Sequence, residues 1–173
     1  MSVIGQGSDR GGRSEKVLVG CLLLHPSEGA LEPDNYASCS SWIENTPMDL
    51  NSRHPAIIEQ DFLLLDQESN REKWDVISLS LVLNFVPEPL DRGRILGLVY
   101  DFLVDGGHLF VALPLHCLSN SRYLDFEHFT GLMECLGFTQ LYGAGASADA
   151  GPFQTKRATS DVIPERFTKK TAL

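Results

Sequence analysis

The feature that most constrains the fold of this chain is the alternation of strand and helix patterns between residues 74 and 142. Apolar, β-branched runs indicate buried strands, and segments with apolar residues at helical spacing lie between them. Strands and helices in this order are typical of a parallel α/β sheet. The predicted elements are a strand at 74–83, a helix from Asp91 to the Asp105-Gly106-Gly107 stop, a strand at 109–113, a helix at 125–137 and a strand at 138–142.

Less regular sequence surrounds this block. We expect the continuous apolar run Val17–Leu24 to form a strand buried on both faces, and Met48-Asp49-Leu50 to end a second, short strand. Residues 1–15 are Gly- and Ser-rich without apolar periodicity, and the chain loses its periodicity again after Gly143. The sequence therefore predicts one domain at 16–143, with a disordered segment at 1–15 and a tail at 144–173.

Charge and cysteine content bound the function. The chain has 173 residues, a net charge of −9 and a pI of about 4.9. This acidic excess gives no electrostatic help in binding nucleic acid, so an RNA substrate would need a local basic surface, or one on chain that is missing here. The four cysteines form no C-x-x-C pair and are expected to be reduced thiols of an intracellular protein. We predict no membrane segment, because the run Val17–Leu24 is too short to span a bilayer.

Two acidic residues lie where a nucleotide would bind. In a parallel α/β sheet, ligands bind outside the carboxyl ends of the strands. Asp49 suits a ribose, because one carboxylate can accept hydrogen bonds from both hydroxyls, and Asp61-Phe62 suits an adenine amino group and ring. On the residues alone, exposed loop carboxylates remain the simpler interpretation of both acids.

The glycine signal for a nucleotide is weak. No G-x-G-x-x-G string follows a predicted strand. Gly29 lies in the loop after the first predicted strand, but some residues beyond its end. Gly5-Gln6-Gly7 has no predicted strand before it, so we assign it to the disordered segment.

Residues that could bind a substrate follow the later strands. Asn84-Phe85-Val86-Pro87 loosely resembles the Asn-Pro-Pro-aromatic box of adenine-amino methyltransferases, although one proline is missing. Asn120, Arg122 and Tyr123 could face a target base or a phosphate. An ordinary turn and an ordinary loop are the alternative interpretations. No acid–base pair can be assigned, so the catalytic residues stay unknown, and the scattered histidines predict no metal site.

Three long strings carry a resemblance to a known family. They are GALEPDNYASCSSWIENTPMDLNSRHPAIIEQDFL, WDVISLSLVLNFVPEPLDRGRIL and GGHLFVALPLHCLSNSRYLDFEHFTGLMECLGF, in this order between Gly29 and Phe138. Together they resemble the 25S ribosomal RNA adenine-N1 methyltransferase family. The relatives of that family include an S-adenosylmethionine sensor that acts in TOR signalling.

The resemblance implies a Rossmann-like class I methyltransferase sheet, with S-adenosylmethionine as the methyl donor. The implied activity is methylation of N1 of an unpaired adenine in large-subunit ribosomal RNA, in the nucleolus of the nucleus. Gly29 and Asp49 match cofactor contacts of the family, and Asp61 and Phe62 match its adenine side less closely. The family also has a helical region before the sheet and further strands after Phe138. We therefore expect an incomplete sheet, truncated or altered at both ends.

Three functions stay open at this point. The chain could be the RNA methyltransferase, a non-catalytic S-adenosylmethionine sensor that controls a protein partner, or a truncated chain without a function of its own. The acidic charge favours the sensor, whereas the strings shared with the enzymes favour the methyltransferase. Adenine N1 carries an in-plane lone pair and no proton, so methyl transfer needs no general base. We expect Phe85 or Tyr123 to stack on the base.

Overall fold

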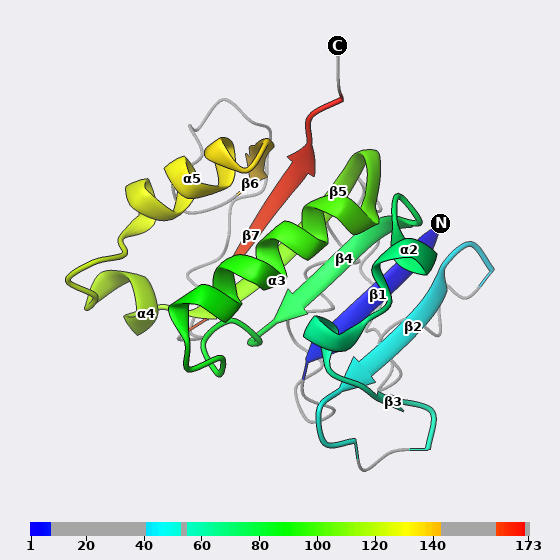
Figure 1. Cartoon of the computed structure of the whole chain (residues 1–173). Coiled ribbons are helices and arrows are strands. Elements are labelled where there is room, and N and C mark those ends of the chain that lie inside the picture. The colour runs from blue at the N-terminus through cyan, green and yellow to red at the C-terminus, as the bar shows by residue number, and fades with distance from the viewer. Residues whose placement is uncertain (8–40, 53–54, 143–161, 172–173) are drawn as a thin grey trace, which may run out of the picture.

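A computed structural model of the chain describes residues 1–7, 41–52, 55–142 and 162–171. Seven strands form one sheet in the order β3-β2-β1-β4-β5-β7-β6 (Figure 1). The strands are β1 (Ser2–Gly7), β2 (Glu44–Asp49), β3 (Ile58–Glu59), β4 (Trp74–Ser80), β5 (Leu103–Pro114), β6 (Phe138–Tyr142) and β7 (Val162–Lys169). The helices are η2 (Phe62–Leu64), α2 (Gln67–Asn70), α3 (Pro89–Phe102), α4 (His116–Ser119) and α5 (Phe126–Cys135).

The predicted parallel α/β sheet is confirmed. Strands β1 to β5 are parallel to one another, and β7 lies antiparallel between β5 and β6, so the complete sheet is mixed. The chain runs outward from β1 to β3 and then returns to β4 on the other side of β1. The strand order therefore reverses at β1 and β4, which places the topological switch point at their carboxyl ends.

The first strand is the main difference from the sequence prediction. β1 lies inside the sheet, paired with β2 on one side and β4 on the other, so the prediction of disorder at 1–15 is wrong for Ser2–Gly7. Only Val3 and Ile4 of this strand are large and apolar, and both are buried, so no apolar run marks it in the sequence. The predicted strand Val17–Leu24 lies outside the described residues, as do residues 8–15.

A polar cluster ties the start of β1 to β4. The backbone N–H of Ser2 donates to Asp75 Oδ2 at 2.7 Å, and the Ser2 hydroxyl donates to the same oxygen at 2.9 Å. These bonds, chiefly the one from the backbone N–H, hold the pKa of the Asp75 carboxyl below its usual range. The cluster supplements the backbone ladder where the apolar content of β1 is low.

The last strand is the second difference. The predicted tail at 144–173 is wrong for Val162–Lys169, because β7 completes the sheet between β5 and β6. Phe167 is fully buried, with its ring centroid 5.8 Å from that of Phe129. Lys169 is only 5% exposed: its Nζ donates to the Leu103 carbonyl at 2.9 Å and lies 4.7 Å from the centroid of the Tyr100 ring. The sheet is thus not the incomplete one expected, but has seven strands.

The helices of the second half of the chain follow the predicted order. α3 begins at Pro89, since proline suits a first helical position, and ends three residues before Asp105. α5 begins after Asp125, whose side chain accepts a hydrogen bond from the His128 N–H at 2.8 Å. Gly137 follows α5 with a φ of 91°, a conformation that favours glycine, so the predicted stop is confirmed.

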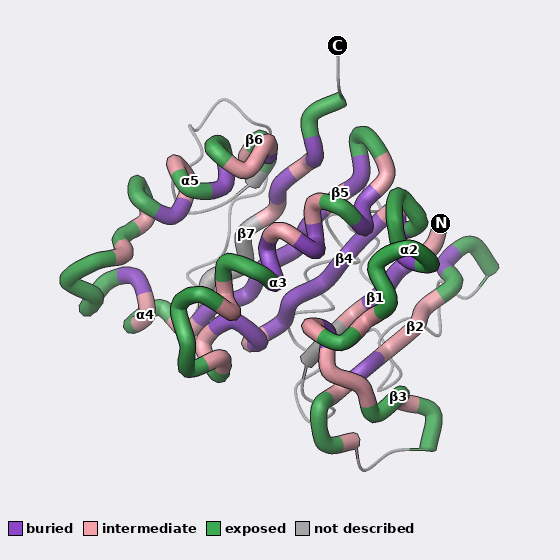
Figure 2. The backbone as a smooth tube through the Cα atoms, viewed as in Figure 1, coloured by how far each residue is buried: buried purple, intermediate pink, exposed green. Residues whose placement is uncertain are grey.

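The main core lies between the sheet and these helices. In Figure 1, α3 crosses the face of β4 and β5, and α5 lies over β6 and β7. Strand β4 is buried along almost its whole length (Figure 2), as a central strand of a parallel sheet should be. Large apolar side chains of both layers meet there: Ile4, Ile77, Leu79, Leu109, Val111, Val99, Phe102, Phe129 and Met133.

Candidate functional site

The carboxyl ends of β1, β2 and β4 form one edge of the sheet. In the register of the strands, Gln6 pairs with Met48 and Gly7 pairs with Ser80. Asp49, the residue after Met48, therefore ends β2 beside the end of β1. A strand that ends in glycine at the switch point lets a ligand approach the backbone closely. The Gly5-Gln6-Gly7 string thus belongs to the candidate site and not to a disordered segment. Its signal was a Gly-x-Gly pair directly after two apolar residues.

Asp49 lies where the sequence predicted it, at the carboxyl end of the second strand. The residue is half-buried, and its Oδ1 accepts a hydrogen bond from the Asn51 N–H at 2.9 Å. Its carbonyl accepts a hydrogen bond from the Gln60 N–H at 3.0 Å, which connects the end of β2 to the segment after β3. The Asn51 N–H thus orients the carboxylate, and the Gln60 N–H fixes the backbone of Asp49 at the edge.

Asp61 and Phe62 have different roles in the folded chain. Asp61 caps η2, with Oδ1 accepting a hydrogen bond from the Leu63 N–H at 2.9 Å. Phe62 is only 1% exposed, and its ring packs against Phe102 with 5.8 Å between the ring centroids. The predicted contact of Phe62 with an adenine ring is wrong, because a phenyl ring enclosed in the core cannot stack on a ligand. Gly29, the other predicted cofactor residue, lies outside the described residues.

The turn after β4 brings Asn84 and Phe85 to the same edge. It begins at Leu81, whose φ of 58° is left-handed and whose N–H donates to the Ala112 carbonyl at 2.9 Å. The side-chain oxygen of Asn84 is buried and has no hydrogen-bond partner, and the ring of the next residue, Phe85, is 77% exposed. A strained branched residue and an unsatisfied buried acceptor are typical of functional sites.

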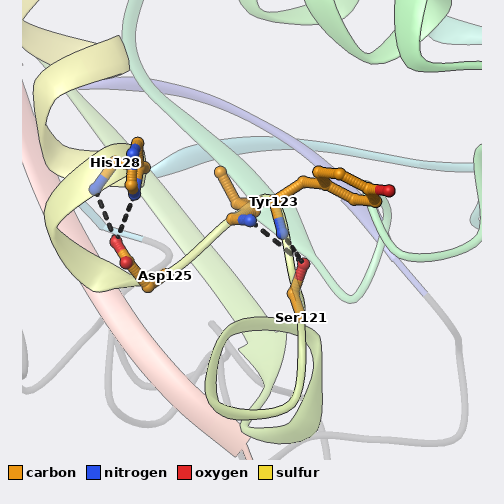
Figure 3. Close-up of polar contacts among 5 residues, drawn as sticks. Ser121, Tyr123, Asp125 and His128 are labelled. Atoms are coloured by element: carbon orange, nitrogen blue, oxygen red, sulfur yellow. Dashed lines mark hydrogen bonds and ion pairs between the residues drawn. The ribbon is translucent and has the colours of Figure 1, made fainter.

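The connection from β5 to α5 holds the other predicted substrate residues. Asn120 ends α4, and Arg122 and Tyr123 are exposed, Tyr123 to 88%. Figure 3 shows how the loop is ordered: the Ser121 hydroxyl accepts hydrogen bonds from the N–H groups of Tyr123, at 3.2 Å, and Leu124, at 3.0 Å. Because β4 and β5 are adjacent and parallel, this loop and the Asn84 turn leave the sheet at the same edge.

Exposed apolar side chains gather in the connections at this edge. They are Leu50 after β2, Phe85 after β4, and Leu115 and Tyr123 after β5, joined by Leu90 in the first turn of α3. Within the described ranges, no three His, Cys, Asp or Glu side chains are grouped as a metal ion would need. No helix of the described part is long and apolar enough to cross a membrane. Such an edge offers stacking surfaces and hydrogen-bond acceptors to a ligand.

The sequence matches, over residues 1–172, the family described as Bmt2, 25S rRNA (adenine(2142)-N(1))-methyltransferase. The chain belongs to this family. The family predicted from the three shared strings is therefore confirmed.

Two yeast relatives of the Bmt2 family are similar to the chain. The 25S rRNA (adenine(2142)-N(1))-methyltransferase of Saccharomyces cerevisiae is 33% identical over 148 residues, which are 79% of this chain and 44% of that protein. The 25S rRNA adenine-N(1) methyltransferase of Schizosaccharomyces pombe is 32% identical over 154 residues, which are 78% of this chain and 56% of that protein. The chain thus spans about half the length of these curated relatives.

Solved structures show the same fold at low identity. The 1,6-didemethyltoxoflavin-N1-methyltransferase of Burkholderia thailandensis, with bound 1,6-didemethyltoxoflavin and S-adenosylhomocysteine, has a TM-score of 0.63 at 12% identity. That match covers 95% of this chain and 80% of the other. An S-adenosylmethionine-dependent methyltransferase of Clostridium acetobutylicum has a TM-score of 0.59 at 12% identity, over 98% of this chain and 84% of the other. The predicted class I methyltransferase fold of this Bmt2 family member is confirmed.

Proposed function

We propose that the chain binds S-adenosylmethionine and transfers its methyl group to N1 of an adenine in large-subunit ribosomal RNA. The observation that carries the proposal is the arrangement at one sheet edge: the Gly7 end of β1 lies between Asp49 and the Asn84-Phe85 turn. In parallel α/β sheets this is the position of nucleotide ligands. Membership of the Bmt2 family, and the names of its two yeast relatives, support methyl transfer to an adenine of this RNA, and the class I methyltransferase fold supports the choice of methyl donor.

The residues at the edge fit the ribose side of the cofactor. The half-buried Asp49 carboxylate is suited to accept hydrogen bonds from the two ribose hydroxyls, and the Gly5-Gln6-Gly7 backbone adjoins it. On the adenine side, the proposal depends on Asp61 alone, because Phe62 is enclosed in the core. Gly29 stays a proposed contact on the strength of the family pattern.

The substrate contacts follow from the chemistry of adenine. Bound at this edge, S-adenosylmethionine would supply an electrophilic methyl group on its sulfonium, which N1 could accept through its in-plane lone pair. No proton has to leave N1, so the chain must mainly orient the base and exclude water. We assign Asn84 Oδ1 as acceptor for the exocyclic amino group, Phe85 or Tyr123 as the stacking ring, and Arg122, with Asn120 beside it, as a contact to the RNA backbone.

A methyl-transfer assay tests the proposal. Large-subunit RNA from cells without this modification is incubated with the chain and S-adenosylmethionine labelled in its methyl group. We expect label in 1-methyladenosine after digestion of the RNA. Label in another nucleoside, or no label although the cofactor binds, would contradict the methyltransferase.

The second candidate function is a non-catalytic S-adenosylmethionine sensor that controls a protein partner. Its support is the net charge of −9, which does not favour RNA binding. Cofactor binding without methyl transfer would favour the sensor, whereas a chain that binds no cofactor would fit neither function. We also propose that the protein acts in the nucleolus of the nucleus, because its proposed substrate is ribosomal RNA; a fluorescent fusion in living cells would test this localisation.

A further inference from the structure

One side chain connects helix α3 to the turn that holds Asn84 and Phe85. Arg92, in the first turn and a half of α3, donates from Nε to the Val86 carbonyl at 2.7 Å and from Nη2 to the Pro87 carbonyl at 3.0 Å. A planar guanidinium has its donors in a fixed fork, so two bonds to successive carbonyls set the direction as well as the position of the turn.

The turn has few other anchors. The Phe85 N–H donates to the Val82 carbonyl at 2.9 Å, and the Val86 side chain packs against the core. Pro87 and Pro89 have no backbone N–H to donate. The left-handed Leu81 at the start of the turn is a conformation that persists only where its surroundings enforce it. The two bonds from Arg92 therefore control how the turn lies after it leaves β4.

Val86 and Pro87, whose carbonyls Arg92 contacts, directly follow Asn84 and Phe85 in the chain. The Asn84 side-chain oxygen is buried without a hydrogen-bond partner, and the Phe85 ring is largely exposed. An unpaired buried acceptor is uncommon in folded proteins, and an acceptor beside an aromatic ring suits a base that has an amino group. By holding the backbone at Val86 and Pro87, Arg92 fixes the positions of both the Asn84 oxygen and the Phe85 ring, without contacting the base itself.

We infer that Arg92 is a positioning residue, which holds Asn84 and Phe85 in the orientation that receives the target adenine. This inference rests on the proposed methyltransferase function and adds a residue outside the reacting groups. Arg92 is half-buried and acts through the turn, whereas the proposed cofactor contacts Asp49 and Asp61 lie at the ends of β2 and β3, so the loss of Arg92 should change the methyl-transfer step and leave these contacts intact.

Three variants of the full chain test the inference. Arg92→Met removes both bonds, and Arg92→Lys can restore only one of them. Arg94→Met is the matched control, because Arg94 lies on the same helix, is exposed and contacts Asp91 at 3.0 Å instead of the turn. The measurements are the single-turnover rate of methyl transfer to undermodified large-subunit RNA, the affinity for S-adenosylmethionine by calorimetry, and the melting temperature.

We expect Arg92→Met to lower the methylation rate at least about tenfold, since a misplacement of about 1 Å can cost on the order of a hundredfold. Arg92→Lys should lie between this variant and the wild type, and Arg94→Met should match the wild type. Cofactor affinity should stay within about twofold in all three. Such a separation of rate from cofactor affinity is not expected of a merely structural residue.

Two results would overturn the inference while the proposed function stands. One is an Arg92→Met variant that methylates at the wild-type rate. The other is a parallel loss of rate, cofactor affinity and melting temperature, which would mark Arg92 as a general stability residue. A wild-type chain that binds cofactor but transfers no methyl group would overturn the proposed function and, with it, the role of Arg92.

Discussion

Replacing Asp49 by alanine should weaken S-adenosylmethionine binding by at least about tenfold. Asp49 ends β2 beside the Gly7 end of β1, where a ribose would lie in a sheet of this topology. A hydrogen bond to a charged group contributes about 1.5–3 kcal/mol. Since about 1.4 kcal/mol corresponds to one factor of ten, the loss of even one such bond gives the expected decrease in affinity.

The same substitution should change stability little. In the folded chain the Asp49 carboxylate accepts one exposed hydrogen bond, from the Asn51 N–H at 2.9 Å. Water can replace that bond, so we expect the free energy of unfolding in urea to fall by less than about 1 kcal/mol. Asp49→Asn keeps an acceptor for this turn but removes the charge, and its cofactor affinity should lie between the wild type and Asp49→Ala.

Calorimetric titration with S-adenosylmethionine measures these affinities. Asp61→Ala is the matched comparison, because an adenine amino group offers a single contact to Asp61, whereas a ribose offers two hydroxyls to Asp49. We expect the smaller loss at Asp61. If the wild type binds and Asp49→Ala binds equally well, or if Asp61→Ala loses more, the ribose does not lie at Asp49 and the assignment of the site is refuted.

The remaining predictions concern the fold. Phe62→Ala should lower the free energy of unfolding by about 3–5 kcal/mol in urea denaturation. Leu64→Ala, at an exposed residue of the same short helix η2, should change it by less than about 0.5 kcal/mol. Equal losses of stability from the two variants would contradict the core position of Phe62. Lys169→Met should cost about 1–3 kcal/mol in the same assay, because it leaves a buried backbone carbonyl of β5 without its donor; an unchanged midpoint would count against this contact. The lowered pKa of Asp75, due chiefly to the N–H of Ser2, stabilises the fold above the pKa of the unfolded carboxyl. The stability difference between the wild type and Asp75→Asn should therefore be constant near neutral pH and shrink as the pH falls below about 4; a difference that grows with acid would reverse the assigned shift.

Local signals made the second half of the chain predictable. The strand Phe138–Tyr142 has the predicted bounds, and α5 lies between the predicted cap Asp125 and the predicted stop Gly137. The outer elements could not be predicted in this way. β1 has only two large apolar residues, and half of Val162–Lys169 is polar or charged, so both are strands because of their partners in the sheet. Pairing between distant segments leaves no period in a single sequence.

Only part of the candidate site could be predicted from the sequence, because some of its residues owe their roles to contacts between distant segments. The position of Asp49 followed from the end of a strand, which a sequence pattern can indicate. The role of Phe62 did not, because an aromatic residue after a strand can either stack on a ligand or fill the core. The direction of the short helix η2 decides between these roles, and it turns Phe62 toward Phe102. Only the packed structure contains that information.

The acidic residues of the chain explain why an acid near a strand end is an ambiguous signal. Asp61, Asp66 and Asp125 each precede a helix, and each accepts a hydrogen bond from a backbone N–H of its first turn. Aspartate is favoured at helix N-caps for this reason, so a rule that selects acids after strands also selects caps in an α/β fold. Asp49 differs from these three, because a turn and not a helix follows it. Its place beside the glycine end of β1 is therefore not explained by capping a helix. Of the two acids proposed as ligands, Asp49 is the one on which the cofactor site depends. The Asp61 carboxylate already caps η2, so it would have to bind the cofactor while keeping that hydrogen bond.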